Sequence, residues 1–367
     1  MTPSNGNGFP SNYAAARAAF MTAAAEAGAR LYQYVHPSAS APDGGTLSCD
    51  VAVLGRADAR KAFVAIAGTH GVEGPTGSMA HTALLRSKLP QLASDCRLVL
   101  VHAINPYGFA CHSRTNENNV DLNRNFVDHS APHPANVLYA AVHAIVCQSD
   151  YSHEQHARQI AALHEWTAEH GADARNQALI AGQYSHPSGK SYGGRRREWS
   201  NRVLQQITDE HLRGIEKIAF IDWHTGLGRY GEELLLCFNE PGSPEYRQCE
   251  QWWGRDRIGT QEGFDGARRP AYRGLLFHGL QRFVAPAQFA GVAVEFGILS
   301  NEAQEGIFML DHWLRFGDHA DVPAAILDDV RRQVREAFTP SDPAWRQSVV
   351  VRSHAVMEKA LRGLQAW

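Results

Sequence analysis

A histidine and a glutamate three residues apart follow an apolar stretch of the chain. His70 and Glu73 lie in the glycine-rich motif GTHGVEG, residues 68–74, directly after a predicted buried strand at 62–67. At this spacing an imidazole nitrogen and a carboxylate oxygen can reach one metal ion, and the glycines let the backbone approach closely. Open α/β sheets place ligand sites at the carboxyl ends of their strands. The position therefore favours a metal site, although one such pair alone also arises by chance in a chain with 19 histidines.

A second apolar stretch ends in another histidine. His224 lies within residues 220–228, where a strand pattern passes into glycine-rich backbone. Catalytic zinc takes three protein ligands and leaves a fourth position for water, and histidine, glutamate and histidine form one of the standard sets. His224 is thus the predicted third ligand. Asp222, two residues earlier, is either an acceptor for an imidazole N–H or a purely structural carboxylate.

One carboxylate stands at the end of a third apolar strand, residues 291–296. Burying Glu295 alone costs several kcal/mol unless it is paired or functional. Beside a zinc-activated water, such a carboxylate accepts a proton and returns it to the leaving amine. A buried structural salt bridge is the alternative.

Arginines and amides gather between residues 105 and 126. Arg124 is suited to bind a substrate carboxylate through two parallel hydrogen bonds, with help from Asn123. Arg114 is suited to polarise a scissile carbonyl and to stabilise its oxyanion. Taken by itself, the segment also fits a structural loop network.

The elements that must position these residues alternate along the chain. Short apolar runs predict strands, and helical spacing of apolar residues predicts helices between them. This alternation favours an α/β sheet with helices on both faces. We expect an N-terminal helical segment at 1–45, a catalytic domain at 46–320 and C-terminal helices at 321–367 packed on the same domain. The predicted strands are 49–54, 62–67, 97–104, 217–222, 233–238 and 291–296, and the predicted helices are 13–27, 76–89, 133–171, 198–216 and two within 322–364.

Composition excludes several classes of protein. The 367 residues are 44% hydrophobic, enough for a large core, and the net charge of -3 gives no bias toward nucleic acid. The arginine run 195–197 is interpreted as a solvated loop or helix start. No apolar run approaches the roughly 20 residues that span a membrane, and the chain does not begin like a signal peptide. With six scattered cysteines interpreted as reduced thiols, these features predict a soluble cytoplasmic protein, whose oligomeric state the sequence leaves open.

Five motifs in order resemble the M14 zinc carboxypeptidase superfamily, and most closely its bacterial DUF2817 branch. The resemblance implies a three-layer α/β/α sandwich around a mixed, mostly parallel eight-stranded sheet, a zinc carboxypeptidase-like (phosphorylase/hydrolase-like) fold. It also implies one zinc ion per chain, with His70, Glu73 and His224 as ligands and Glu295 as general base. Arg114 takes the carbonyl-polarising position, and Asn123 with Arg124 the carboxylate-binding position. The motifs lie at 68–74, 105–109, 121–126, 222–226 and 294–297.

The resemblance bears on the substrate as well. Peptidase members contribute a mobile tyrosine near the leaving group, and among the tyrosines in expected loops we single out Tyr192 and Tyr272 as substrate-binding candidates. Arg114 precedes the Asn-Arg pair at a spacing nearer that of the aspartoacylase and succinylglutamate desuccinylase relatives. The leading hypothesis is a metallocarboxypeptidase-like hydrolase of peptides next to a free carboxylate. The alternatives are an N-acyl amino acid deacylase and a non-catalytic metal-binding module, the latter disfavoured because Glu295 is present.

Overall fold

One mixed sheet of eight strands forms the middle of the computed structural model, which describes residues 8–87, 92–259 and 270–367. Across the sheet the strand order is β1-β2-β4-β3-β5-β8-β6-β7. Strands β4, β3, β5 and β8 are parallel neighbours, as are β6 and β7, while the other three pairs are antiparallel. The strands are β1 (Arg30–Ser40), β2 (Thr46–Gly55), β3 (Lys61–Ile66), β4 (Cys96–His102), β5 (Lys217–Tyr230), β6 (Glu233–Leu236), β7 (Ile258–Gly259) and β8 (Gln288–Gly297).

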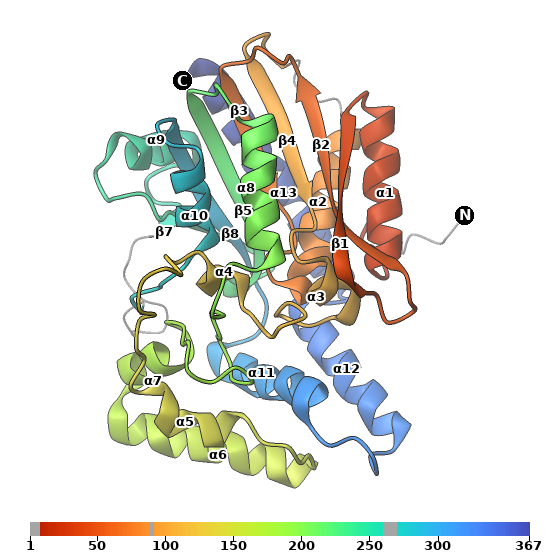
Figure 1. Cartoon of the computed structure of the whole chain (residues 1–367), viewed down its shortest axis with the longest axis vertical. Coiled ribbons are helices and arrows are strands. Elements are labelled where there is room, and N and C mark those ends of the chain that lie inside the picture. The colour runs from red at the N-terminus through yellow and green to blue at the C-terminus, as the bar shows by residue number, and fades with distance from the viewer. Residues whose placement is uncertain (1–7, 88–91, 260–269) are drawn as a thin grey trace.

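Helices cover both faces of this sheet, so the predicted three-layer α/β/α sandwich is confirmed (Figure 1). Successive side chains of a strand point to opposite faces. In β3, Phe63 packs into the core under one helical layer and Val64 into the core under the other. One layer comprises α1 (Tyr13–Glu26), α2 (Gly74–Arg86), α9 (Pro244–Trp253) and α13 (Pro343–Ala366), and the other comprises α8 (Trp199–His211) and α10 (Leu276–Phe283).

A further group of helices lies beyond the carboxyl ends of the parallel strands (Figure 1). Three of them come from the segment between Phe126 and Lys217, and their own small core includes Tyr139, Leu163 and Met309. Helix α12 packs against α11. The group consists of α5 (Tyr139–Val146), α6 (His153–His170), α7 (Ala172–Leu179), α11 (Asn301–Phe316) and α12 (Ala324–Phe338).

The strands and helices expected from the sequence are present, with additions. All six predicted strands form. Strand β1 was not predicted, because it contains no continuous apolar run: most of its residues are exposed or half-buried at the sheet edge. The predicted helix at 133–171 is divided into α5 and α6. The predicted helix at 76–89 begins at Gly74, and its last residues, 88–89, lie outside the described residues.

Length and apolar content together would be needed for a helix to cross a membrane, and no helix in the described residues has both.

Candidate metal centre

The two metal-binding motifs meet because they leave neighbouring strands at the same end. β3 and β5 are parallel partners, with Ile66 opposite Asp222. After β3 the chain turns at His70 into a short 3-10 helix, η1 (Gly71–Glu73). A side chain at Gly71 would overlap the backbone of Gly108, so glycine lets η1 pack tightly on α3 (Pro106–Cys111). His70 and Glu73 are thereby held opposite His224.

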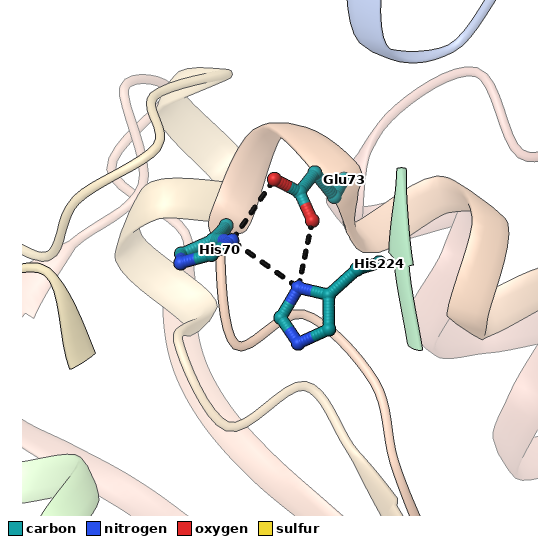
Figure 2. Close-up of side chains that lie close together, drawn as sticks. All are labelled: His70, Glu73 and His224. Carbon is teal, nitrogen blue, oxygen red and sulfur yellow. Dashed lines mark hydrogen bonds and ion pairs between the residues drawn. The ribbon is translucent and has the colours of Figure 1, made fainter. Parts of the chain in front are cut away.

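His70, Glu73 and His224 are buried and converge on one point, as Figure 2 shows. The Nδ1 atom of His70 lies 2.9 Å from Glu73 Oε1, and the Nδ1 atom of His224 lies 2.9 Å from Glu73 Oε2. The two Nδ1 atoms are 3.2 Å apart. One ligand atom from each of the three residues lies within 4.8 Å of the others. The three residues can therefore reach one ion together.

The opposite nitrogen of each imidazole faces a carboxylate. His70 Nε2 lies 3.2 Å from Asp121 Oδ1, and His224 Nε2 lies 2.8 Å from Asp222 Oδ2. Thr69 Oγ1 donates to Asp222 Oδ1 at 2.7 Å and fixes that carboxylate. With the imidazole protons on these Nε2 atoms, both Nδ1 lone pairs point toward Glu73. Three electron-rich groups at this separation are stable together when a cation lies among them, so the site fits a divalent metal such as zinc.

The same contacts shift the pKa values of Glu73 and His224, and a metal ion would have to displace a proton from His224. Burial by itself would raise the pKa of Glu73, but His70 and His224 beside it hold that pKa well below its ordinary value. Burial would likewise lower the pKa of His224, but Asp222 and Glu73 raise it well above the usual range. Glu73 is accordingly a carboxylate, which is the form that binds metal.

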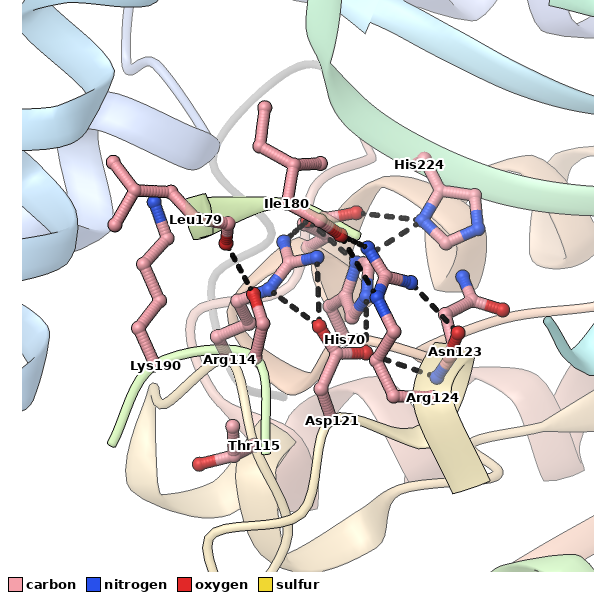
Figure 3. A network of polar contacts seen from close by, with 12 residues as sticks. His70, Arg114, Thr115, Asp121, Asn123, Arg124, Leu179, Ile180, Lys190 and His224 are labelled. Atoms are coloured by element: carbon pink, nitrogen blue, oxygen red, sulfur yellow. Dashed lines mark hydrogen bonds and ion pairs between the residues drawn. The ribbon is translucent and has the colours of Figure 1, made fainter. Parts of the chain in front are cut away.

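Arg114 lies beside the ligands rather than among them (Figure 3). Its Nη1 donates to Glu73 Oε1 at 3.2 Å, and its Nε and Nη2 both donate to Asp121 Oδ2 at 3.2 Å. The guanidinium also lies 5.2 Å from the centre of the Phe308 ring. Asp121 thus orients both a ligand and Arg114, and its pKa is held well below the ordinary value, against the effect of burial, mainly by Arg114.

Arg124 is held by neutral oxygens in the same cavity. Its Nε donates to Ile180 O at 3.0 Å and its Nη1 to Asn123 O at 2.7 Å. The Tyr272 ring centre lies 5.2 Å from the guanidinium carbon. Asn123 Oδ1 accepts from the Leu276 N–H at 2.9 Å, which fixes the amide. Among the described residues Arg124 has no carboxylate within ion-pair distance, so its charge is available to an anion.

Glu295 faces the metal centre from the next strand. β5 and β8 are parallel, and Glu295 stands opposite His224 in register, so the two side chains lie on the same side of the sheet. Its Oε2 accepts from the Leu227 N–H at 3.3 Å. Burial raises the pKa of this carboxyl; His224 opposes the shift and Glu73 adds to it. A half-buried carboxylate with a raised pKa is suited to accept and return a proton.

One cavity of about 150 Å³ is lined by the three ligands together with Arg114, Asn123, Arg124 and Glu295. Sequence reasoning missed much of its wall. Leu179, Ile180 and Lys190 come from the helical segment between Phe126 and Lys217, and Lys190 Nζ lies 2.5 Å from Glu305 Oε2. Neither residue belongs to a motif, and they are 115 positions apart, so no local signal identifies the pair. Asp121 could have been identified from the sequence, since it begins the predicted carboxylate-binding motif.

The two tyrosine candidates differ in position. Tyr272 lines the cavity, on the wall that also holds Arg124. Tyr192 is buried and is not among the described residues that line the cavity. Its backbone pairs with Gln183, and its carbonyl accepts from the Asp121 N–H at 2.8 Å. The structure thus brings Tyr272 to the site and gives Tyr192 a place in the backbone that supports Asp121.

Comparison with known proteins gives one family and a set of similar folds. The model of the family described as "Protein of unknown function (DUF2817)" matches residues 9–352. No curated protein matches the chain. Carboxypeptidase A from Helicoverpa armigera is 12% identical with a TM-score of 0.50, over 97% of this chain and 73% of that one. Bovine thrombin-activatable fibrinolysis inhibitor, solved with tick carboxypeptidase inhibitor, is 9% identical with a TM-score of 0.50, over 96% of each chain. At these identities the likeness is one of fold.

Proposed function

The chain belongs to the DUF2817 family, and we propose that it is a zinc-dependent amide hydrolase of the metallocarboxypeptidase type that acts next to a free carboxylate. One observation carries the proposal. The same cavity is lined by a three-donor metal site, a half-buried carboxylate and an arginine that has no acidic partner among the described residues. These are the parts that hydrolysis of a carboxylate-bearing amide requires.

His70, Glu73 and His224 would hold one zinc ion, which supplies Lewis acidity and lowers the pKa of water. Glu295 takes a proton from the attacking water and returns it to the leaving amine. Arg114, held beside Glu73 by Asp121, stabilises the negative charge that develops on the carbonyl oxygen.

Arg124 and Asn123 bind the free carboxylate of the substrate. The guanidinium is positioned by Ile180 O and Asn123 O, and Tyr272 covers it. Because the Arg124 guanidinium is already oriented before the substrate binds, binding does not have to order this side chain, and its entropic cost is lower. In this arrangement Arg124 and Asn123 select the substrate by its carboxylate, and Glu295 acts at the neighbouring amide, beside the residues that would hold zinc.

A second candidate, an N-acyl amino acid deacylase, is favoured by the size of the cavity. About 150 Å³ of it is open to the centre of a water molecule. Leu179, Ile180 and Lys190 close it on the side of the inserted helices. A cavity of this size suits short substrates. The metal, Glu295 and Arg124 have the same roles in both candidates.

We also propose that residues 46–320 form the catalytic domain and that the C-terminal helices pack on it. The segment at 1–45 is not wholly helical as expected, because its residues Arg30–Ser40 form β1, the edge strand of the same sheet. Phe338 of α12 lines the cavity, so the C-terminal segment completes its wall.

The decisive experiment measures amide hydrolysis by the zinc-loaded protein on matched substrates. The set contains peptides with free carboxyl ends, the same peptides amidated, and N-acyl amino acids, each with and without a chelator. Chelator-sensitive release from free-ended peptides supports the carboxypeptidase, and cleavage confined to N-acyl amino acids supports the deacylase. Hydrolysis that survives complete removal of metal would refute both.

A further inference from the structure

A second hollow, of about 520 Å³, lies apart from the metal centre, where the start of α8 meets the end of α10. These two helices pack side by side on one face of the sheet (Figure 1). Three arginines line the hollow: Arg197 just before α8, Arg273 just before α10, and Arg282 in the last turn of α10. We refer to the space between these three residues as the arginine hollow. The metal ligands do not line it.

Two of these arginines are held in place by neutral groups. Arg197 Nε donates to Asn201 Oδ1 at 2.8 Å, and its guanidinium lies 5.3 Å from the centre of the Phe283 ring. Arg282 Nη2 donates to Phe126 O at 2.7 Å. Asn201 is itself fixed, because its amide donates to Asn125 O at 3.1 Å. The guanidiniums are therefore oriented before any ligand arrives.

Positive charge in the hollow is not balanced. Within residues 8–87, 92–259 and 270–367, none of the three arginines has a carboxylate at ion-pair distance. Asp128 is the acidic residue in the described wall, and its Oδ1 accepts from the Ser130 N–H and hydroxyl instead. Burial and the nearby Arg202 lower the pKa of Arg197, as expected for a cation without a counter-charge. Like charges gathered in this way repel, and an anion among them removes that cost.

We propose that the arginine hollow binds a small dianionic oxyanion of the phosphate type. A guanidinium offers parallel N–H donors that match the oxygens of phosphate, and three of them around one space can surround it. The volume leaves room for the anion and several water molecules. Arg197, the last residue of the arginine run at 195–197, thus forms one site with Arg273 and Arg282, which are remote from it in sequence.

Consecutive residues of the chain line the metal cavity and the arginine hollow. Tyr272 lines the metal cavity, while the next residue, Arg273, lines the arginine hollow. A side chain at Gly274 would overlap the carbonyl of Arg124, and Gly274 O accepts from the Phe126 N–H at 3.1 Å. An anion held by Arg273 therefore lies one residue from the tyrosine that covers Arg124. The anion site does not depend on the hydrolase activity proposed above.

The test is calorimetric titration of inorganic phosphate into the full-length, metal-loaded protein, with chloride holding the ionic strength constant. Saturable binding is expected, and Arg197→Gln and Arg282→Gln should each weaken it about tenfold or more. Arg195→Gln is the matched control: it removes the same charge from an exposed residue outside the hollow and should bind as the wild type does.

Two results would overturn the proposal. One is the absence of saturable binding. The other is binding that Arg197→Gln and Arg282→Gln leave unchanged, or that Arg195→Gln weakens equally, since phosphate would then be held at the metal centre or by general surface charge. If loss of the contact to Asn201 prevents Arg197→Gln from folding, Arg273→Gln, at an exposed position, provides the same measurement.

Discussion

The Nδ1 atoms of His70 and His224 lie 3.2 Å apart, and each ring turns its other nitrogen toward a carboxylate. Two imidazoles that share this arrangement present both lone pairs to one point. Such a geometry is typical of metal ligands whose orientation is fixed from behind. The role of the carboxylates behind the rings, Asp121 and Asp222, can therefore be tested by substitution, as that of the ligands can.

Replacing Asp222 by Asn should weaken zinc binding by about 10- to 100-fold. The amide keeps the size of the side chain but removes the negative charge that orients His224 and raises its basicity. Competition with a chromophoric chelator measures the zinc affinity. Asp58→Asn, at an exposed position, is the control and should have wild-type affinity. Unchanged affinity in Asp222→Asn would assign this carboxylate a purely structural role.

Glu295→Gln should retain one zinc ion per chain while turnover falls by about 10²- to 10⁴-fold. Glutamine preserves the contact to the Leu227 N–H but cannot accept a proton from water. Elemental analysis gives the zinc content, and steady-state kinetics gives kcat. Near wild-type turnover in a zinc-loaded variant would remove Glu295 from the mechanism.

Arg124→Gln and Arg114→Gln should affect different kinetic parameters. Arg124→Gln should raise KM for free-carboxylate substrates on the order of 30-fold or more, because the substrate anion loses its partner. Arg114→Gln should chiefly lower kcat, because its charge acts on the transition state. The comparison uses the same peptide with a free and an amidated end. An equal rise in KM for both ends in Arg124→Gln would contradict the carboxylate-binding role.

The metal ligands could be predicted from local sequence because each stands where an apolar strand passes into glycine-rich backbone. That β3 and β5 are neighbours, although about 150 residues separate them, follows from the packing of the whole sheet. Residues that act through such distant contacts leave no local pattern. Lys190 and Glu305 form a half-buried pair between the segment at 127–216 and α11, and neither belongs to one of the five motifs.

The choice between tyrosines shows the same limit. Tyr192 and Tyr272 both lie outside regular helices and longer strands, and their surroundings in the sequence are similarly polar. Their positions are decided by remote partners: Tyr192 by Gln183 and Asp121, and Tyr272 by the guanidinium of Arg124. The edge strand β1 was missed for another reason. A strand with many exposed residues carries no continuous apolar run, which is the signal that identified the buried strands.

Stability should depend on pH through a histidine that is not a metal ligand. His102 of β4 is fully buried, stacks on the Phe20 ring at a centroid distance of 4.7 Å, and shares a hydrogen bond with Ser78 Oγ at 2.9 Å. Burial lowers the pKa of His102 to about 4. In the unfolded chain an ordinary histidine has a pKa of about 6.5. As pH falls below 6.5, the unfolded state therefore binds a proton that the folded state does not, and the free energy of unfolding decreases.

The decrease attributable to His102 should approach about 3 kcal/mol by pH 4, at about 1.4 kcal/mol for each pH unit. His102→Gln keeps a hydrogen-bonding side chain for Ser78 but cannot take up the proton, so its stability should fall less steeply between pH 7 and pH 5. Denaturant titrations of both proteins under identical metal conditions measure the difference in slope, because the pH dependence of metal binding is common to both. His153→Gln, at an exposed position on α6, should follow the wild type. Parallel curves for wild type and His102→Gln would mean that the buried imidazole does not contribute to acid sensitivity.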